Sequence, residues 1–117
     1  MTGRFARLGA RDVPLERLSV EGMANGWSCI LLTEHIEWEE FPNYAEAVAG
    51  LIGTRLGRAV DGPDIRMRGF RLGLRCFWIV FDDFPLGVTI EPRSRLADCE
   101  IPRLHAHLSE WTRPSGS

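Results

Sequence analysis

The sequence predicts one small α+β domain, with an antiparallel sheet of four to five strands and two helices packed on one face. Three observations lead to this prediction. Apolar runs of strand length are separated by turn residues, two segments carry apolar residues at helical spacing, and a chain of 117 residues can bury one hydrophobic core. The predicted order of elements is hairpin, helix, three-stranded meander and helix.

The composition is that of a globular domain. With 44% hydrophobic and 26% charged residues, the chain has enough apolar surface to offset the entropy lost on folding. We expect residues 1–112 to form a single domain, in which residues 1–15 are a poorly defined N-terminal arm. We expect residues 113–117 to be a flexible tail.

Several features favour a cytoplasmic, bacterial-type protein. The chain has no run near the ~18 apolar residues that cross a bilayer, and its start lacks the apolar stretch of a secretory signal. Its 3 cysteines are an odd number and lie far apart, which fits a reducing compartment better than a disulfide framework. All the basic residues are arginine, as is typical of a GC-rich genome. We expect no membrane partner.

The first predicted element is a β-hairpin. The segment Leu18–Glu21 alternates in polarity, residues 22–26 supply turn chemistry, and Trp27–Ile36 is apolar on both faces near its middle. Such a two-sided apolar run is typical of a central strand. A short helix over residues 14–21 is the alternative for the first part of this segment.

A helix follows, opened by Asn43. The pair Asn43 and Glu46 has capping-box spacing, and Gly57 stands where a left-handed residue would end the helix. Its predicted buried side consists of Tyr44, Val48, Leu51, Ile52 and Leu56. Two glycines inside it, Gly50 and Gly53, each cost about 1 kcal/mol relative to alanine, which we interpret as tolerated weakness.

In the next segment, residues 65–74, the apolar residues shift from odd to even positions. Ile65 and Met67 are apolar at odd positions, whereas Phe70 and Leu72 are apolar at even ones. We therefore predict a β-bulge at Gly69, which returns both sets to the core. The same bulge places Arg66, Arg68, Arg71 and Arg75 together on the solvent face.

The remaining elements complete the meander and close the domain. Strands are predicted over residues 75–82 and 88–92, with a turn between them. Asp98 is the predicted cap of a second helix, whose apolar stripe is Ile101, Leu104, Leu108 and Trp111.

Charge is distributed unevenly along the chain. The net charge of -2 and a pI near 5.9 argue against a dedicated nucleic-acid binder. Residues 18–54 nevertheless contain six acids and no arginine, while residues 55–75 contain six arginines and two acids. The two blocks either pair across the fold or form separate acidic and basic faces.

The strand-to-helix connection carries the first functional hypothesis. It mixes large aromatic rings with carboxylates, a combination typical of protein interfaces. The chain is then a non-enzymatic protein-binding or adaptor module whose partner is another protein or a second copy of the chain. The predicted contact residues are Glu34, Glu37, Trp38, Glu39, Glu40 and Phe41. In the alternative interpretation, Trp38 and Phe41 anchor the helix entrance to the core.

Two other hypotheses rest on weaker patterns. Asp82, Asp83 and Glu91 could hold a divalent cation in a small metal-dependent enzyme, although aspartates before a turn commonly accept hydrogen bonds from their own backbone. The arginine face Arg66, Arg68, Arg71 and Arg75 could bind RNA, although charged residues are common on the solvent face of a sheet.

Other candidate chemistry is poorly supported. His105 and His107 are two residues apart, so on a helix they point about 200° apart and cannot share a zinc ion. Cys99 has no evident base, and standard catalytic motifs are absent from the sequence. We expect no cofactor and assign no catalytic residue. The layout resembles that of some toxin-system immunity proteins and small secretion chaperones, in architecture only.

Overall fold

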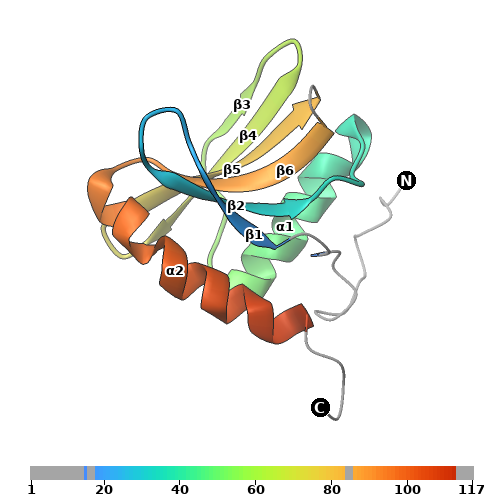
Figure 1. The fold of residues 1–117 in the computed structure, drawn as a ribbon. Helices are drawn as coiled ribbons and strands as arrows, with labels where there is room; N and C mark the ends of the chain where they lie inside the picture. The colour runs from blue at the N-terminus through green and yellow to red at the C-terminus, as the bar shows by residue number, and fades with distance from the viewer. Residues whose placement is uncertain (1–14, 16–17, 84–85, 113–117) are drawn as a thin grey trace.

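The computed structural model describes residues 15, 18–83 and 86–112 of the chain. Its strands form one antiparallel sheet in the order β1-β2-β6-β5-β4-β3 (Figure 1). The strands are β1 Ser19–Gly22, β2 Ser28–Thr33, β3 Ala59–Asp61, β4 Ile65–Leu72, β5 Arg75–Asp83 and β6 Leu86–Pro92. The helices are α1 Phe41–Ile52 and α2 Arg95–Ser109, with short 3-10 turns η2 Trp38–Glu40 and η3 Glu110–Thr112.

The predicted α+β class, the antiparallel sheet and the placement of both helices on one face are confirmed. The sheet has six strands rather than four to five, because β3 pairs with β4 at one edge. With only three residues, β3 is too short to show an alternating pattern in the sequence. Within the described ranges, neither helix combines the length and the hydropathy needed to span a membrane.

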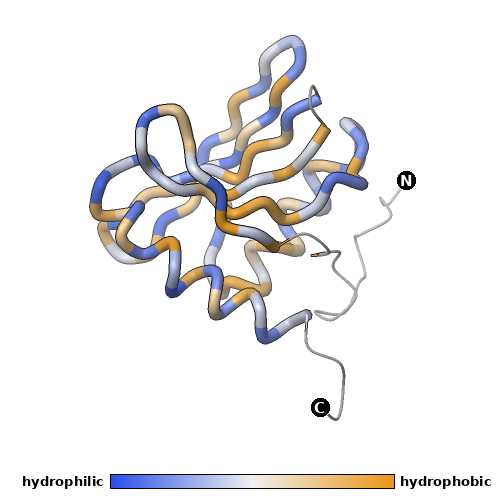
Figure 2. The backbone as a smooth tube through the Cα atoms, in the orientation of Figure 1, coloured by the Kyte–Doolittle hydropathy of each residue, from blue (hydrophilic) through white to orange (hydrophobic). Residues whose placement is uncertain are grey.

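The hydrophobic core lies between the helices and the sheet. Helix α2 packs across β2, β6 and β5, while α1 lies beside β4 and against α2. Hydrophobic and hydrophilic residues alternate along α2 in Figure 2, as expected for a helix with one buried side. The largest fully buried side chains include Tyr44, Phe41, Phe77, Phe81, Ile30, Leu32, Ile79, Ile90, Ile101 and Leu108.

The β-bulge predicted at Gly69 is absent. Strand β4 pairs with β5 without a register shift, from Ile65 opposite Asp82 to Leu72 opposite Arg75. The prediction failed because it assumed that only one side of the sheet buries apolar residues. Ile65 and Met67 instead lie on the side away from the helices, where they are half-buried.

The start and end of α1 differ from the predicted ones. The helix begins at Phe41 rather than after Asn43. The capping box is formed before α1, by Glu37 and Glu40 around η2. It ends at Gly53, whose φ of 85° is left-handed. Gly57 does not end the helix. Its backbone N–H instead donates to the carbonyl of Gly69 in β4 at 2.7 Å.

The start of α2 is also corrected. Its N-cap is Ser94, whose Oγ accepts a hydrogen bond from the Ala97 N–H at 3.1 Å. Asp98 lies in the first turn and accepts a hydrogen bond from the Ser28 N–H at 2.7 Å. The carboxylate therefore joins α2 to the start of β2 instead of capping the helix.

Gly50 within α1 and Gly53 at its C-terminal cap predict opposite mutational effects. A Cβ at Gly50 would meet nothing within 4 Å, and this residue is exposed in the helix interior. Gly50→Ala should therefore raise the free energy of unfolding by up to about 1 kcal/mol in urea denaturation. Gly53→Ala should lower it, because alanine is strained at the positive φ. Equal effects of the two substitutions would contradict this description of the helix end.

Candidate functional site

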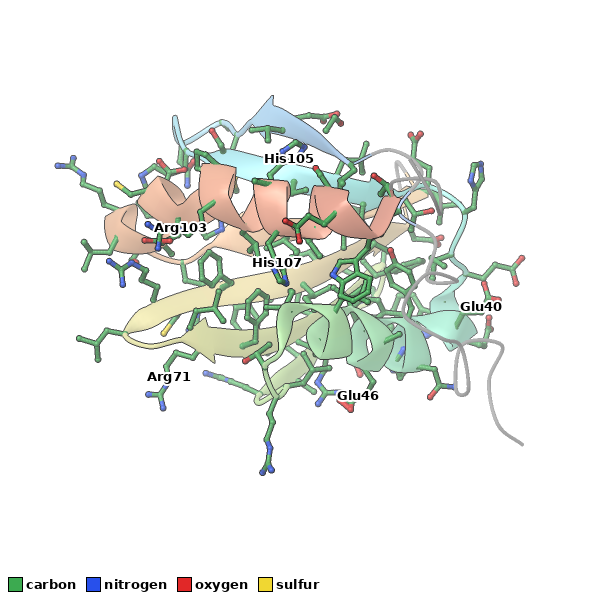
Figure 3. All side chains as sticks on the ribbon, turned by 90° about the horizontal axis from the view of Figure 1, so that it is seen from below. Glu40, Glu46, Arg71, Arg103, His105 and His107 are labelled. Carbon is green, nitrogen blue, oxygen red and sulfur yellow. The ribbon has the colours of Figure 1, made fainter. Side chains whose placement is uncertain are left out.

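Both helices lie on the same side of the sheet, so its other side has no covering helix or strand in the described part of the chain (Figures 1 and 3). We call this side the open face. Because directly paired residues of neighbouring strands share a face, the register assigns its members. One row crosses all six strands and contains Ser19, Leu31, Thr89, Val80, Met67 and Val60.

The centre of the open face is apolar. Leu31 and Val80 are only 9% and 3% exposed, although neither of the described helices covers them. Met67 is half-buried beside Val80, and Trp78 is half-buried one row along the same strand. The open face thus has a hydrophobic floor of its own.

Carboxylates surround one part of this floor. A cavity of about 300 Å³ is lined by Leu31 and Val80 at its base and by four acidic side chains. These acids are Glu21, Glu34, Asp82 and Glu91. We call this group the acidic rim. It brings together residues from β1, the end of β2, β5 and β6, which are far apart in the sequence.

Two groups at or near the acidic rim have raised pKa values. Burial raises the pKa of the Glu91 carboxyl, and the negative charge of Asp82 raises it further, while a hydrogen bond from the Thr89 hydroxyl at 3.3 Å opposes the shift. Burial, with help from Glu91 and Glu21, also raises the pKa of the Cys29 thiol. A raised pKa keeps this thiol protonated, so it is a poor nucleophile.

The aromatic residues of the predicted contact segment pack inward. Phe41 is 1% exposed and its ring lies 5.8 Å from that of Phe81. The half-buried Trp38 meets the edge of Phe81 at 5.9 Å, and the Arg66 guanidinium lies 5.1 Å from the Trp38 ring. Arg66 Nη1 also donates to the Trp38 carbonyl at 2.9 Å. Trp38 and Phe41 therefore anchor the helix entrance, which was the alternative interpretation.

The acids of that segment have different environments. Glu34 lines the acidic cavity, so it links the segment to the open face. Glu37 and Glu39 are exposed, whereas Glu40 is half-buried and its Oε1 accepts a hydrogen bond from the Glu37 N–H at 2.9 Å. Figure 3 shows Glu40 at one end of the molecule, opposite Arg71. The exposed side chains of the predicted contact segment are therefore acidic, and neither of its two aromatic rings is fully exposed.

The three predicted metal ligands are not brought together. Asp82 and Glu91 line the same cavity. Asp83, the next residue of β5, is not among the residues that line this cavity. Among the residues with a described structure, no group of three or more His, Cys, Asp or Glu is arranged to hold a metal ion.

The four arginines of the predicted face lie on two sides of the sheet. Arg66 and Arg68 are opposite Phe81 and Ile79, on the helix side, and Arg71 is on the open face. Arg66 pairs with Asp61 at 3.1 Å. The cause is again the unbroken β4 register, which alternates consecutive residues between the two faces.

The last arginine of that set also lies on the helix side. Arg75 is opposite Leu72 and pairs with Glu100 of α2 at 3.2 Å. Arg66, Arg68, Arg71 and Arg75 therefore do not form the single solvent face that was predicted.

A different set of arginines surrounds a second cavity, of about 470 Å³, which the pattern of residues did not predict. Its arginines are Arg55, Arg58, Arg71 and Arg93. Three of them, Arg55, Arg58 and Arg71, belong to the basic block at residues 55–75 that is visible in the sequence. Arg93 lies outside that block, and only the pairing of strands brings it close.

Both histidines of α2 contact backbone carbonyl groups, and Cys99 is exposed. His105 Nε2 lies 2.8 Å from the Leu18 carbonyl oxygen, and His107 Nε2 lies 2.9 Å from that of Leu51. Figure 3 shows the two rings on opposite sides of α2, which confirms the predicted divergence. Cys99 is exposed in the same helix.

Comparisons with protein-family models, curated proteins and solved structures found no match to this chain. Its function therefore has to be inferred from its own surface chemistry.

The raised pKa of Glu91 predicts a pH-dependent stability effect. For an acid whose folded-state pKa lies above its ordinary value of 4.5, ionisation destabilises the folded state. Stability from this group is present below pH 4.5 and is lost as the pH rises through the folded-state pKa. Glu91→Gln should therefore unfold at higher urea concentration than the wild type at pH 7, with the gain vanishing near pH 4. The raised pKa of Glu91 would be contradicted if Glu91→Gln gained the same stability at both pH values. It would also be contradicted if Glu46→Gln, at an exposed position, gained as much stability as Glu91→Gln.

Proposed function

We propose that the chain is a non-enzymatic protein-binding or adaptor module that receives a basic, partly apolar segment of a partner protein on the open face. The observation that carries this proposal is the combination of a hydrophobic floor with carboxylates around it. Leu31 and Val80 form the floor, and the acidic rim encloses them. Interfaces commonly have such an apolar centre inside a polar border.

Each part of the surface has a physical role in the proposed binding. Leu31 and Val80 are already nearly buried, so most of the apolar area that a partner would cover belongs to the half-buried Met67 and Trp78 beside them. Removing that area from water supplies about 25 cal/mol per Å² before the costs of association. The acidic rim attracts arginine or lysine side chains of the partner and orients them. Exposed Glu37 and Glu39 extend the negative charge beyond β2.

The chemistry of the cavity supports binding over catalysis. Its carboxylates surround an apolar base, and the nearby Cys29 thiol has a raised pKa. Long basic side chains suit this arrangement because their aliphatic stems pack on apolar surface while the charged ends reach carboxylates.

Charge reversal on the acidic surface tests the proposal. The variant Glu21→Arg/Glu39→Arg changes two exposed acids, one in β1 that lines the acidic cavity and one in η2. The control Glu46→Arg/Glu110→Arg makes the same charge change at exposed positions on α1 and η3. A partner is captured with the wild type, purified, and titrated calorimetrically against all three proteins. We expect the first variant to bind at least tenfold more weakly and the control to bind like the wild type.

Equal affinity of the Glu21→Arg/Glu39→Arg variant and the wild type would overturn the proposal, provided that circular dichroism shows both to be folded. A self-association seen by light scattering and lost only in this variant would identify a second copy of the chain as the partner.

A further inference from the structure

The cavity lined by Arg55, Arg58, Arg71 and Arg93 is a concentrated positive site. We call it the arginine cavity. Its arginines come from three places: the segment after α1, strand β4, and the residue that follows β6. Within the parts of the chain that the structure describes, no carboxylate lines it.

Backbone hydrogen bonds fix two of these arginines beside β4. The left-handed Gly53 ends α1 and turns the chain back along the sheet. The Gly57 N–H then donates to the Gly69 carbonyl at 2.7 Å, and the Gly69 N–H donates to the Arg58 carbonyl at 2.8 Å. These bonds hold the segment that carries Arg55 and Arg58 as an extension of the sheet edge.

The segment is also tied to Arg71. The Thr54 hydroxyl donates to the Arg71 carbonyl at 3.0 Å, so the loop and the strand keep their relative positions at this point. Figure 3 shows the Arg71 side chain pointing away from the two helices. The guanidinium group is thus presented outward by a strand whose pairing is regular.

Arg93 is positioned from the opposite side of the cavity. The backbone N–H of Arg93 donates to the Cys76 carbonyl at 2.9 Å, and Cys76 is the direct cross-strand partner of Arg71. The guanidinium carbon of Arg93 lies 4.3 Å from the centre of the Trp78 ring. Stacking on an aromatic ring holds the guanidinium plane while leaving its N–H edge open to an acceptor.

Among the residues that the structure describes, no carboxylate neutralises the arginine cavity. All four arginines are exposed, and no ion pair joins any of them to a carboxylate among the residues placed by the structure. Arg66 and Arg75, by contrast, pair with Asp61 and Glu100. Guanidinium groups gathered round one cavity repel one another and concentrate counter-ions there. An anion with several acceptor oxygens would relieve this repulsion.

We propose that the arginine cavity binds a small molecule carrying a diphosphate or two nearby phosphoryl groups. Arginine binds phosphoryl oxygens through two parallel hydrogen bonds, so several arginines can contact more than one such group. The volume of about 470 Å³ lies in the range of small-molecule sites and exceeds what a single phosphate fills.

The rest of the open face favours a small ligand over a nucleic acid. A nucleic-acid strand needs a basic track along which successive phosphates lie. Beyond Trp78 the face instead presents Glu91, which is its direct cross-strand partner, and then the rest of the acidic rim. These carboxylates would repel an extended chain of phosphates, whereas a compact ligand stays within the arginine cavity.

Calorimetric titration at low ionic strength tests the site with inorganic pyrophosphate, ADP and orthophosphate. We expect one site per chain, with pyrophosphate and ADP binding more tightly than orthophosphate. Arg71→Ala should weaken pyrophosphate binding at least tenfold, because a charge-assisted pair of hydrogen bonds is lost. The affinity of Arg71→Lys for pyrophosphate should lie between those of the wild type and Arg71→Ala, because lysine keeps the charge and loses the forked geometry.

Arg103→Ala is the matched control. It removes one positive charge from an arginine whose side chain is 85% exposed on α2, outside the arginine cavity. We expect its affinity for pyrophosphate to equal that of the wild type. Amide resonances of residues 54–58 should shift on addition of pyrophosphate, which locates the ligand independently of affinity.

Three results would overturn the proposal: no binding of pyrophosphate or ADP, equal binding by wild type and Arg71→Ala, or equal losses in Arg71→Ala and Arg103→Ala. Arg71-dependent retention of a single-stranded RNA without binding of the small phosphates would also overturn it and make the site a nucleic-acid interface. The test does not involve the acidic rim, so its failure leaves the proposed protein-binding function standing.

Discussion

The unbroken pairing of β4 with β5 is the constraint on which the surface of this protein depends. Eight residue pairs run from Ile65 opposite Asp82 to Leu72 opposite Arg75 without a bulge. Strict alternation then sends Phe70 to the core and Met67 to the open face. A single extra residue in β4 would reverse one of these assignments, so the register decides which apolar and which basic side chains reach the open face.

The open face combines features that a solvent-facing sheet normally lacks. Its centre holds the nearly buried Leu31 and Val80, with the acidic rim around one part and the arginine cavity at another. The two regions adjoin at one cross-strand pair, in which Trp78 lies under Arg93 and Glu91 belongs to the acidic rim. Two regions of opposite charge therefore lie on one surface, and each combines residues of one sequence block with residues from β5, β6 or the segment after β6. Both of our proposals, a basic protein segment and a small phosphorylated ligand, follow from this separation.

Elements with strong local signals were predictable from the sequence. The hairpin ending in β2, the strands of the meander and the apolar stripe of α2 were expected and are present, because their patterns depend on neighbouring residues alone. Helix ends were less predictable. Asn43 has the chemistry of a cap, yet Pro42 starts the helix earlier, and Gly57 is used by the sheet rather than by α1. The candidate sites were least predictable: Phe41 has the properties of either an interface anchor or a core residue, and its packing against Phe81 decides between them.

The sequence by itself determined the α+β class, the single hydrophobic core and the presence of separate acidic and basic blocks, since composition and periodicity carry this information locally. Only the tertiary structure decided that Glu21, Asp82 and Glu91 meet around one cavity and that Arg93 joins Arg55, Arg58 and Arg71 around another. These groups depend on strand order and register. Both arise from pairing between distant segments, and no local pattern of residue types specifies them.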